Sequence, residues 1–210
     1  MKGLFLFPCN GNALEAINCI DSRKYNLIGF VDDTIEKQNK SFLGVQVFSR
    51  EVLYDYKDAL ILAVPGSPLS YMKRKKIIDE LGVDSKRFTT IIHPNATISP
   101  FAKIGTNVLI MSGVVITSNA IIGNHVCVLP NSVIHHDTII KEYCLIGSNV
   151  TIASNSIVEK NCYIGSGTSV INGVSIGAYS LIGIASNVIS NIPANSKVVG
   201  NPSRIIGNII

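Results

Sequence analysis

The chain has 210 residues, a net charge of +4 and 47% hydrophobic residues, but only 15% charged residues. This length holds two small domains, or one repeat array with a cap. The charge is mildly basic and no nucleic-acid-binding motif accompanies it, so we do not expect nucleic-acid binding. The apolar segment 1–9 is too short to span a membrane and lacks a cleavage-site pattern, so we expect no membrane insertion.

The cysteines predict a reducing environment. There are five of them, an odd number, and none forms a CxxC pair. This favours free thiols and a cytoplasmic location over a disulfide framework. Cys144 and Cys162 are eighteen residues apart, and we expect them to stack inside a repeat as small buried side chains.

Residues 1–85 alternate between strand-like and helix-like segments, which predicts a small parallel α/β sheet of Rossmann type. The basic run 73–76 is expected on a solvated helix face. In chain order, we predict strands at Gly3–Phe7, Asn26–Val31 and Leu60–Val64, and helices at Ala13–Ile20 and from Ser67 or Ser70 to Leu81.

Ligands of such sheets bind beyond the carboxyl ends of the strands. Free amides at the start of the first helix favour a phosphate, and an acidic residue after the second strand suits a ribose or a base. The GxGxxG fingerprint is missing, so we expect a mononucleotide or nucleotide-sugar site rather than hydride chemistry; a purely structural cap is the alternative. The candidate substrate-binding residues are Asn10, Gly11, Asn12, Asp32, Asp33, Pro65 and Gly66.

A six-residue repeat fills the segment from His93 to Val188. A period of six does not fit an amphipathic helix, and it predicts a hexapeptide β-helix in which three hexads make one coil. We expect glycine or asparagine to take the backbone conformations of the corners. The predicted domains are therefore 1–85, Rossmann-like, and 86–210, a β-helix with a C-terminal tail. The repeating aliphatic residues are Ile98, Ile104, Ile110, Ile116, Ile122, Val128, Ile134, Ile140, Ile146, Ile152, Val158, Ile164, Val170, Ile176, Ile182 and Val188.

The sequence His135-His136-Asp137 is the one group of imidazole and carboxylate in the repeat. A histidine that titrates near neutral pH is a natural general base for an amine or hydroxyl nucleophile. A neighbouring carboxylate fixes its tautomer. His125 lies ten and eleven residues away on a different face of the repeat, so we do not expect a metal site.

The closing segment IPANSKVVGNPSRII (192–206) is similar to the closing motif of hexapeptide acyltransferases, which lay acetyl-CoA along the outside of the coil. With the front α/β domain and the SVIHHD segment (132–137), the whole chain resembles the PglD/NeuD-like sugar acetyltransferases of bacteria. The resemblance implies a left-handed parallel β-helix, a homotrimer and acetyl-CoA as co-substrate.

The resemblance also assigns roles to residues. His136 and Asp137 match the catalytic pair, although the family often has glutamate in place of Asp137. A second family histidine falls at Leu145, and a histidine of the nucleotide loop falls at Asn12. The residues matched to the cofactor site are Ser154, Ser166, Ile184 and, for the CoA phosphate, Arg204.

The implied reaction is acetyl transfer from acetyl-CoA to the amino group of a nucleotide-linked 4-amino-4,6-dideoxy sugar, with His136 as general base. One alternative is an O-acetyltransferase of sialic-acid-like sugars, which would use the same base on a hydroxyl. The other is a non-catalytic nucleotide-binding scaffold.

Overall fold

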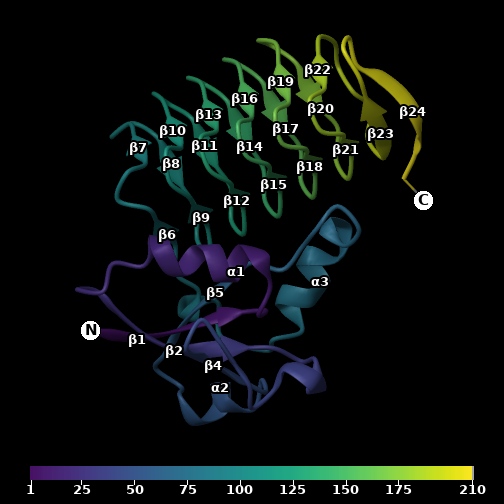
Figure 1. The fold of residues 1–210 in the computed structure, drawn as a ribbon. Helices are drawn as coiled ribbons and strands as arrows, with labels where there is room; N and C mark the ends of the chain where they lie inside the picture. The colour runs from purple at the N-terminus through teal and green to yellow at the C-terminus, as the bar shows by residue number, and fades with distance from the viewer. Residues whose placement is uncertain (210) are drawn as a thin grey trace.

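The computed structural model describes residues 1–209, which form an α/β domain and a three-sided coil of short strands (Figure 1). The α/β domain has one sheet in the order β3-β4-β2-β1-β5. All its pairs are parallel except β3–β4, an antiparallel hairpin at one edge that the sequence did not predict. The expected small parallel sheet of an α/β domain is otherwise confirmed. Its strands are β1 (Lys2–Phe7), β2 (Tyr25–Val31), β3 (Ser41–Phe42), β4 (Val45–Phe48) and β5 (Leu60–Ala63).

Helices cover both faces of this sheet. Successive side chains of a strand point to opposite sides, so the apolar side chains of β1 need a covering layer on each side. Leu4 and Leu6 of β1 pack in one cluster with the first helix, while Phe5 and Phe7 pack in another with the other two. The helices are α1 (Gly11–Ala16), α2 (Val52–Asp55) and α3 (Arg74–Asp79), with 3-10 turns η1 (Ile17–Cys19), η2 (Ile35–Lys37), η3 (Tyr71–Lys73) and η4 (Ser85–Arg87).

The repeat forms three parallel sheets, as the period of six predicts. Each hexad gives a two-residue strand, and each strand pairs with the one eighteen residues away, as Val115 does with Thr97 and Val133. The first sheet holds β7 (Thr97–Ile98), β10 (Val115–Ile116), β13 (Val133–Ile134), β16 (Thr151–Ile152), β19 (Ser169–Val170) and β22 (Asn187–Val188). The second holds β8 (Lys103–Ile104), β11 (Ile121–Ile122), β14 (Ile139–Ile140), β17 (Ile157–Val158) and β20 (Ser175–Ile176).

The third sheet faces the α/β domain and includes the last two strands of the described residues. It holds β6 (Ile91–Ile92), β9 (Leu109–Ile110), β12 (Cys127–Val128), β15 (Leu145–Ile146), β18 (Tyr163–Ile164) and β21 (Leu181–Ile182), followed by β23 (Ser196–Val199) and β24 (Arg204–Asn208). The final strand, β24, pairs antiparallel with β23. No helix in residues 1–209 is long and apolar enough to cross a membrane.

Aliphatic side chains fill the inside of the coil. Ile134, Ile146 and Ile152 are fully buried there. The predicted stacking of Cys144 and Cys162 is confirmed, since both thiols are buried and donate to the carbonyls of Glu159 and Gly177, at 3.0 and 3.2 Å. Because the interior is closed, polar chemistry is confined to outward-facing strand positions and to corners.

The corners differ in one respect from the expectation. The left-handed backbone conformation falls three residues after the aliphatic, where asparagine, as at Asn131 and Asn149, is the most frequent residue. The glycines directly after the aliphatic do not adopt it. They are needed because the next coil passes too close: a Cβ at Gly147 would lie 2.5 Å from the backbone nitrogen of Ser166.

The two domains share one apolar interface, and α1 lies between the sheet and the coil (Figure 1). The interface also differs from the prediction that residues 73–76 form a solvated helix face. Lys73, Lys75 and Lys76 are exposed, but Arg74 is fully buried and its Nε donates to the carbonyl of Tyr143 at 3.0 Å. The prediction was wrong at Arg74 because α3 turns one side toward the coil.

Candidate functional site

The catalytic candidates lie at the corner between β13 and β14. With its proton on Nδ1, His136 donates to Oδ2 of Asp137 at 2.7 Å. The other oxygen, Oδ1, accepts from Nδ2 of Asn119 at 3.1 Å, one coil earlier. Asp137 has a φ of 58°, which places its side chain beside the preceding imidazole. The corner geometry of the repeat thus creates the pair.

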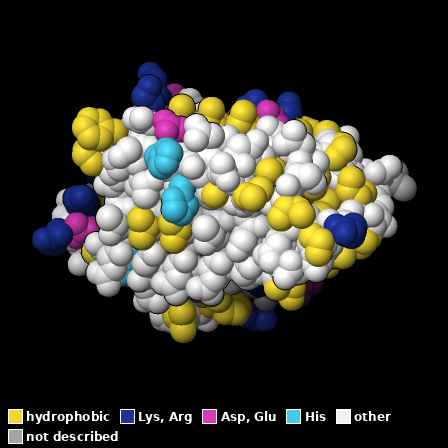
Figure 2. Space-filling view, turned by 90° about the horizontal axis from the view of Figure 1, so that it is seen from above, with side chains coloured by type: hydrophobic (Ala, Val, Ile, Leu, Met, Phe, Trp, Pro, Cys, Tyr) yellow, Lys and Arg dark blue, Asp and Glu magenta, His cyan; other side chains and the backbone are white. Residues whose placement is uncertain are grey.

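This arrangement suits a general base. Hydrogen bonds from His136 first and Asn119 second lower the pKa of Asp137, so the carboxylate stays ionised and holds the proton on Nδ1. The Nε2 lone pair is then left to accept a proton. The side chains of His136 and Asp137 are 53% and 44% exposed, so both point away from the prism. Figure 2 shows histidine and acidic side chains together on the outer face of the coil.

Three of the residues matched to the cofactor site occupy two different corners, and the fourth lies on the last strand. Ser154 lies one coil after His136 at the same corner, where the Asn155 amide donates to the His136 carbonyl at 3.2 Å. Ser166 and Ile184 lie at the corner that leads from the third sheet into the first; the Oγ of Ser166 accepts from the Ser148 amide, and Ile184 is 73% exposed. Arg204 is exposed on β24. One chain therefore does not bring these four residues together.

The substrate-binding candidates line two neighbouring cavities. One, of about 310 Å³, lies between the α/β domain and the third sheet of the coil. The other, of about 370 Å³, lies at the carboxyl ends of the front strands. Asn10 and Gly66 line both cavities, Gly11 and Asn12 line the first, and Asp32, Asp33 and Pro65 line the second.

Two asparagines fix the conformation of the loop after β1 through hydrogen bonds. The Oδ1 of Asn10 accepts from the Ala13 amide at 3.0 Å and caps α1. Both Asn10 and Asn12 donate through Nδ2 to the Val64 carbonyl, at 3.2 and 3.5 Å. These bonds join the end of β1 to the end of β5, so the cavity walls on the two strands are linked.

The two aspartates after β2 are already engaged. Asp32 accepts hydrogen bonds from the Cys9 amide, the Thr34 amide and Nζ of Lys37. Burial opposes its ionisation, but the hydrogen bonds from Thr34 and Lys37 outweigh burial and lower its pKa. Asp33 forms a bidentate pair with Arg50. Asp32 thus shapes the loop, and Asp33 is the more exposed of the two carboxylates.

Both departures from the family pattern line the smaller cavity. Leu145 is 5% exposed and lies in the third sheet, on β15, with β14 of the second sheet between it and the His136 corner along the chain. Asn12 faces the same cavity from the front domain, and Leu129 and Tyr163 complete its apolar floor. Sequence reasoning missed Tyr163, although its eighteen-residue spacing from Leu145 was a usable signal.

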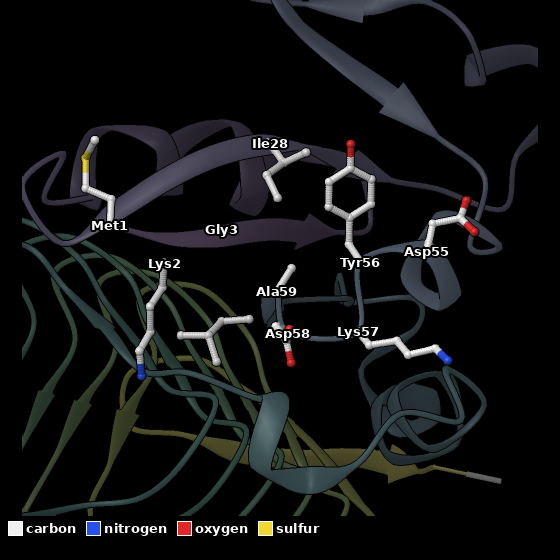
Figure 3. A pocket seen from close by; sticks show the side chains of 10 residues that line it. Met1, Lys2, Gly3, Ile28, Asp55, Tyr56, Lys57, Asp58 and Ala59 are labelled. Atoms are coloured by element: carbon white, nitrogen blue, oxygen red, sulfur yellow. The ribbon is translucent and has the colours of Figure 1, made fainter.

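A larger cavity, of about 560 Å³, lies elsewhere and contains none of the predicted site residues. It is lined by the start of β1, by Ile28 and by the segment 55–60 (Figure 3). This is the amino end of the parallel strands, opposite the edge at which α/β sheets bind ligands. We therefore place the functional site at the two smaller cavities and the His136 corner.

Comparisons with known proteins agree with this architecture. Residues 119–154 match the family model described as bacterial transferase hexapeptide (six repeats). A comparison with curated sequences found no match. Among solved structures, the chain is similar to PerB from Caulobacter crescentus in complex with CoA and GDP-perosamine, with a TM-score of 0.85 and 23% identity over 99% of this chain and 98% of that one.

Two further solved structures have the same fold. The acetyltransferase domain of PglB from Neisseria gonorrhoeae, in complex with acetyl coenzyme A, has a TM-score of 0.85 and 21% identity over 98% of this chain and 99% of that one. WeeI from Acinetobacter baumannii has a TM-score of 0.81 and 21% identity over 98% and 100% of the two chains. The resemblance expected from the sequence is confirmed: the chain has the fold of hexapeptide-repeat acetyltransferases over its whole length.

Proposed function

We propose that this hexapeptide-repeat protein is an acetyl-CoA-dependent N-acetyltransferase that acts on a nucleotide-linked 4-amino-4,6-dideoxy sugar. The observation that carries the proposal is the exposed His136–Asp137 pair at a coil corner, inside the segment that matches the transferase model. The fold supports it further, because PerB, to which the whole chain is similar, was solved with CoA and GDP-perosamine.

In the proposed reaction, the sugar amine attacks the thioester carbonyl and a C–N bond forms. Nε2 of His136 accepts the proton that the nitrogen loses, and Asp137 stabilises the resulting imidazolium. Backbone amides near Ser154 stabilise the oxyanion of the tetrahedral intermediate. The C–S bond then breaks, and the imidazolium returns the proton to the CoA thiolate.

The proposed active assembly is a homotrimer, because a single chain separates the parts of the site. Ser154 shares the His136 corner, whereas Ser166 and Ile184 lie at the other edge of the first sheet, and the 310 Å³ cavity lies against the adjoining third sheet. A neighbouring copy that packs against this sheet would bring the two edges together. Ser154 of one chain would then face Ser166 and Ile184 of the next, with acetyl-CoA between them.

The deciding experiment is a panel of UDP-, GDP- and dTDP-linked amino sugars assayed with acetyl-CoA, with release of free thiol as the readout. We expect turnover with at least one 4-amino-4,6-dideoxy sugar and a product acetylated on nitrogen. Free and CMP-linked sialic acids are the comparison substrates. Turnover with those alone would replace the proposal with O-acetylation, and a chain that binds no acetyl-CoA by calorimetry would be a non-catalytic scaffold.

A further inference from the structure

One corner of the coil contacts the front domain on five successive turns. The corner residues are spaced by eighteen and all have positive φ, between 52° and 63°. We call them the docking corner: Asn107, His125, Tyr143, Asn161 and Tyr179. Their number shows that the front domain is held along most of the coil rather than at one point.

The outer members of the docking corner are bound through separate hydrogen bonds. Asn107 pairs with both backbone groups of Ala63, as its Oδ1 accepts from the amide at 2.7 Å and its Nδ2 donates to the carbonyl at 2.8 Å. At the other end, the hydroxyl of Tyr71 donates to the Tyr179 carbonyl at 2.9 Å. Nδ2 of Asn161 donates to the Met72 carbonyl at 3.5 Å. The end of β5 and the turn η3 are thus both fixed to the coil.

Arg74 binds the middle of the docking corner. Its Nε donates to the Tyr143 carbonyl at 3.0 Å, its Nη2 to the His125 carbonyl at 2.6 Å, and its Nη1 to the Pro65 carbonyl. The side chain is fully buried, and burial lowers its pKa to about 10, so it remains charged at neutral pH. A buried charge is stable only where hydrogen bonds compensate its lost hydration, and here three carbonyls do so.

The third carbonyl connects Arg74 to the substrate-binding candidates. Pro65 and Gly66 line the cavity at the front strands, and Gly66 also lines the cavity at the coil. A Cβ at Gly66 would lie 2.8 Å from Cδ1 of Leu145 and 3.1 Å from Nη1 of Arg74. The loop is therefore in close contact with the cavity floor on one side and the guanidinium on the other.

We propose that Arg74 is a positioning residue for the nucleotide-sugar site. By tying Pro65 to His125 and Tyr143, it sets the front-domain wall of the 310 Å³ cavity at a fixed place over Leu145. This inference rests on the function proposed above. The residues matched to acetyl-CoA lie on the coil alone, so the role of Arg74 concerns one substrate and not the other.

The test replaces Arg74 by methionine, which keeps most of the stem and removes the three donors. We expect the KM for the nucleotide sugar, and the Kd for its nucleotide by calorimetry, to rise about tenfold or more, because small misplacements of a binding wall are costly. The Kd for acetyl-CoA should change by less than about twofold, since the residues matched to acetyl-CoA do not include the loop. Lys75→Met is the matched control, because Lys75 neighbours Arg74 on α3 but is exposed and pairs with Asp79.

Asn107→Ala provides a second variant in case Arg74→Met does not fold, and the same selective loss is expected because it frees the end of β5. A folded variant of either kind with an unchanged nucleotide-sugar KM overturns the inference. So does an equal loss of affinity for both substrates, which would indicate a purely structural role.

The unaltered protein separates this inference from the proposed function. If the unaltered protein binds no nucleotide sugar, the proposed function itself fails and the inference falls with it. Normal binding by both the unaltered protein and the variants overturns the inference alone.

Discussion

Nδ1 of His136 lies 2.7 Å from Oδ2 of Asp137, the next residue in the chain. Adjacent residues in a strand point to opposite sides, so such a pair needs a corner at which the backbone reverses its course. The φ of 58° at Asp137 provides that corner. An asparagine occupies the corresponding position one coil earlier and one coil later, at Asn119 and Asn155. The candidate pair is therefore a small change to a recurrent structural position.

Replacing His136 by alanine should remove the base and leave the coil intact. We expect kcat to fall by about 100- to 10,000-fold, the usual loss for a positioned general base. Affinity for acetyl-CoA, measured by calorimetry, should stay the same. His135→Ala serves as the control, since the ring of His135 does not bond to Asp137 in the described residues. Near-normal turnover by His136→Ala would remove His136 from the proposed role.

Asp137→Asn tests the orientation of the imidazole. Asparagine accepts the left-handed backbone conformation at this corner, so the fold should be unaffected. It can no longer stabilise an imidazolium by charge, and we expect kcat to fall by about tenfold or more, with less loss than for His136→Ala. A steady-state comparison of the two variants is the measurement. An Asp137→Asn protein with unaltered kcat would show that the carboxylate is dispensable.

Mixing two inactive variants tests whether the site spans two chains. His136→Ala lacks the base, and Ile184→Asp places a carboxylate where acetyl-CoA is expected at the other corner. Random trimers from equal amounts should regain about a quarter of the unaltered activity, since a working site needs an intact base from one chain and an intact corner from its neighbour. Activity is measured at an acetyl-CoA concentration at which neither variant turns over alone. No recovery, despite exchange of subunits confirmed by mass spectrometry, would place both corners of a site on one chain.

We predict that the free energy of unfolding depends on pH through His125. Its ring stacks on Tyr143 at 4.7 Å, and burial first, with the charge of Arg74 second, lowers its pKa from 6.5 to about 4. Asp79 and Glu142 act in the opposite direction and Lys75 in the same direction as Arg74. Between these two pH values the unfolded chain binds a proton that the folded chain does not, so the free energy of unfolding should fall as pH drops from 6.5 to 4, by a few kcal/mol in order of magnitude.

The measurement for His125 is urea unfolding at pH 7, 5.5 and 4. His125→Asn is the comparison, because asparagine tolerates the left-handed corner and does not titrate. Titrating groups that do not interact with His125 contribute equally to both proteins, so the difference between them reports the imidazole together with its interactions with Asp79 and Glu142. The variant should be the less stable protein at pH 7 and lose less on acidification. Parallel curves for the two proteins would contradict the assignment.

Gly165→Ala tests the spacing of the coils. A Cβ at this position would lie 2.6 Å from the backbone nitrogen of Ile184, and backbone cannot move aside as a side chain can. We expect the free energy of unfolding to fall by about 1–3 kcal/mol, typical of overpacking in a closed core. Gly173→Ala is the contrasting variant, because Gly173 has open space around it but a φ of 73°, so its cost is backbone strain. Equal stability of Gly165→Ala and the unaltered protein would refute the close-contact explanation.

The sequence predicts the coil well because each hexad repeats the same physical requirement. An error at one hexad is corrected by its neighbours, and even the facing pair Cys144 and Cys162 follows from the spacing. The front domain offers no such redundancy. Arg74 looked like one of four solvated basic residues, and only the packing of α3 against the coil shows that it is buried.

The candidate site likewise contains one feature that the sequence alone could suggest and others that only the fold shows. The pairing of His136 with Asp137 is local, so adjacency in the sequence was enough to suggest it. Asp32 was expected to contact a ligand, but its carboxylate already accepts hydrogen bonds from Cys9 and Lys37. The amide of Cys9 lies on a loop far from Asp32 in the sequence. Contacts of this kind depend on how two loops meet, which no periodicity encodes.

Repeat proteins gain or lose whole coils easily in evolution, because each coil mainly contacts its neighbours. The docking corner restricts that freedom here. Tyr71 reaches the carbonyl of Tyr179 while Asn107 is bound to Ala63, so the front domain is matched to the length of the stack between them. Deleting one coil inside this span would break several of these bonds at once, whereas coils added beyond Tyr179 would break none. Changes in the number of coils should therefore be confined to the part of the stack beyond Tyr179.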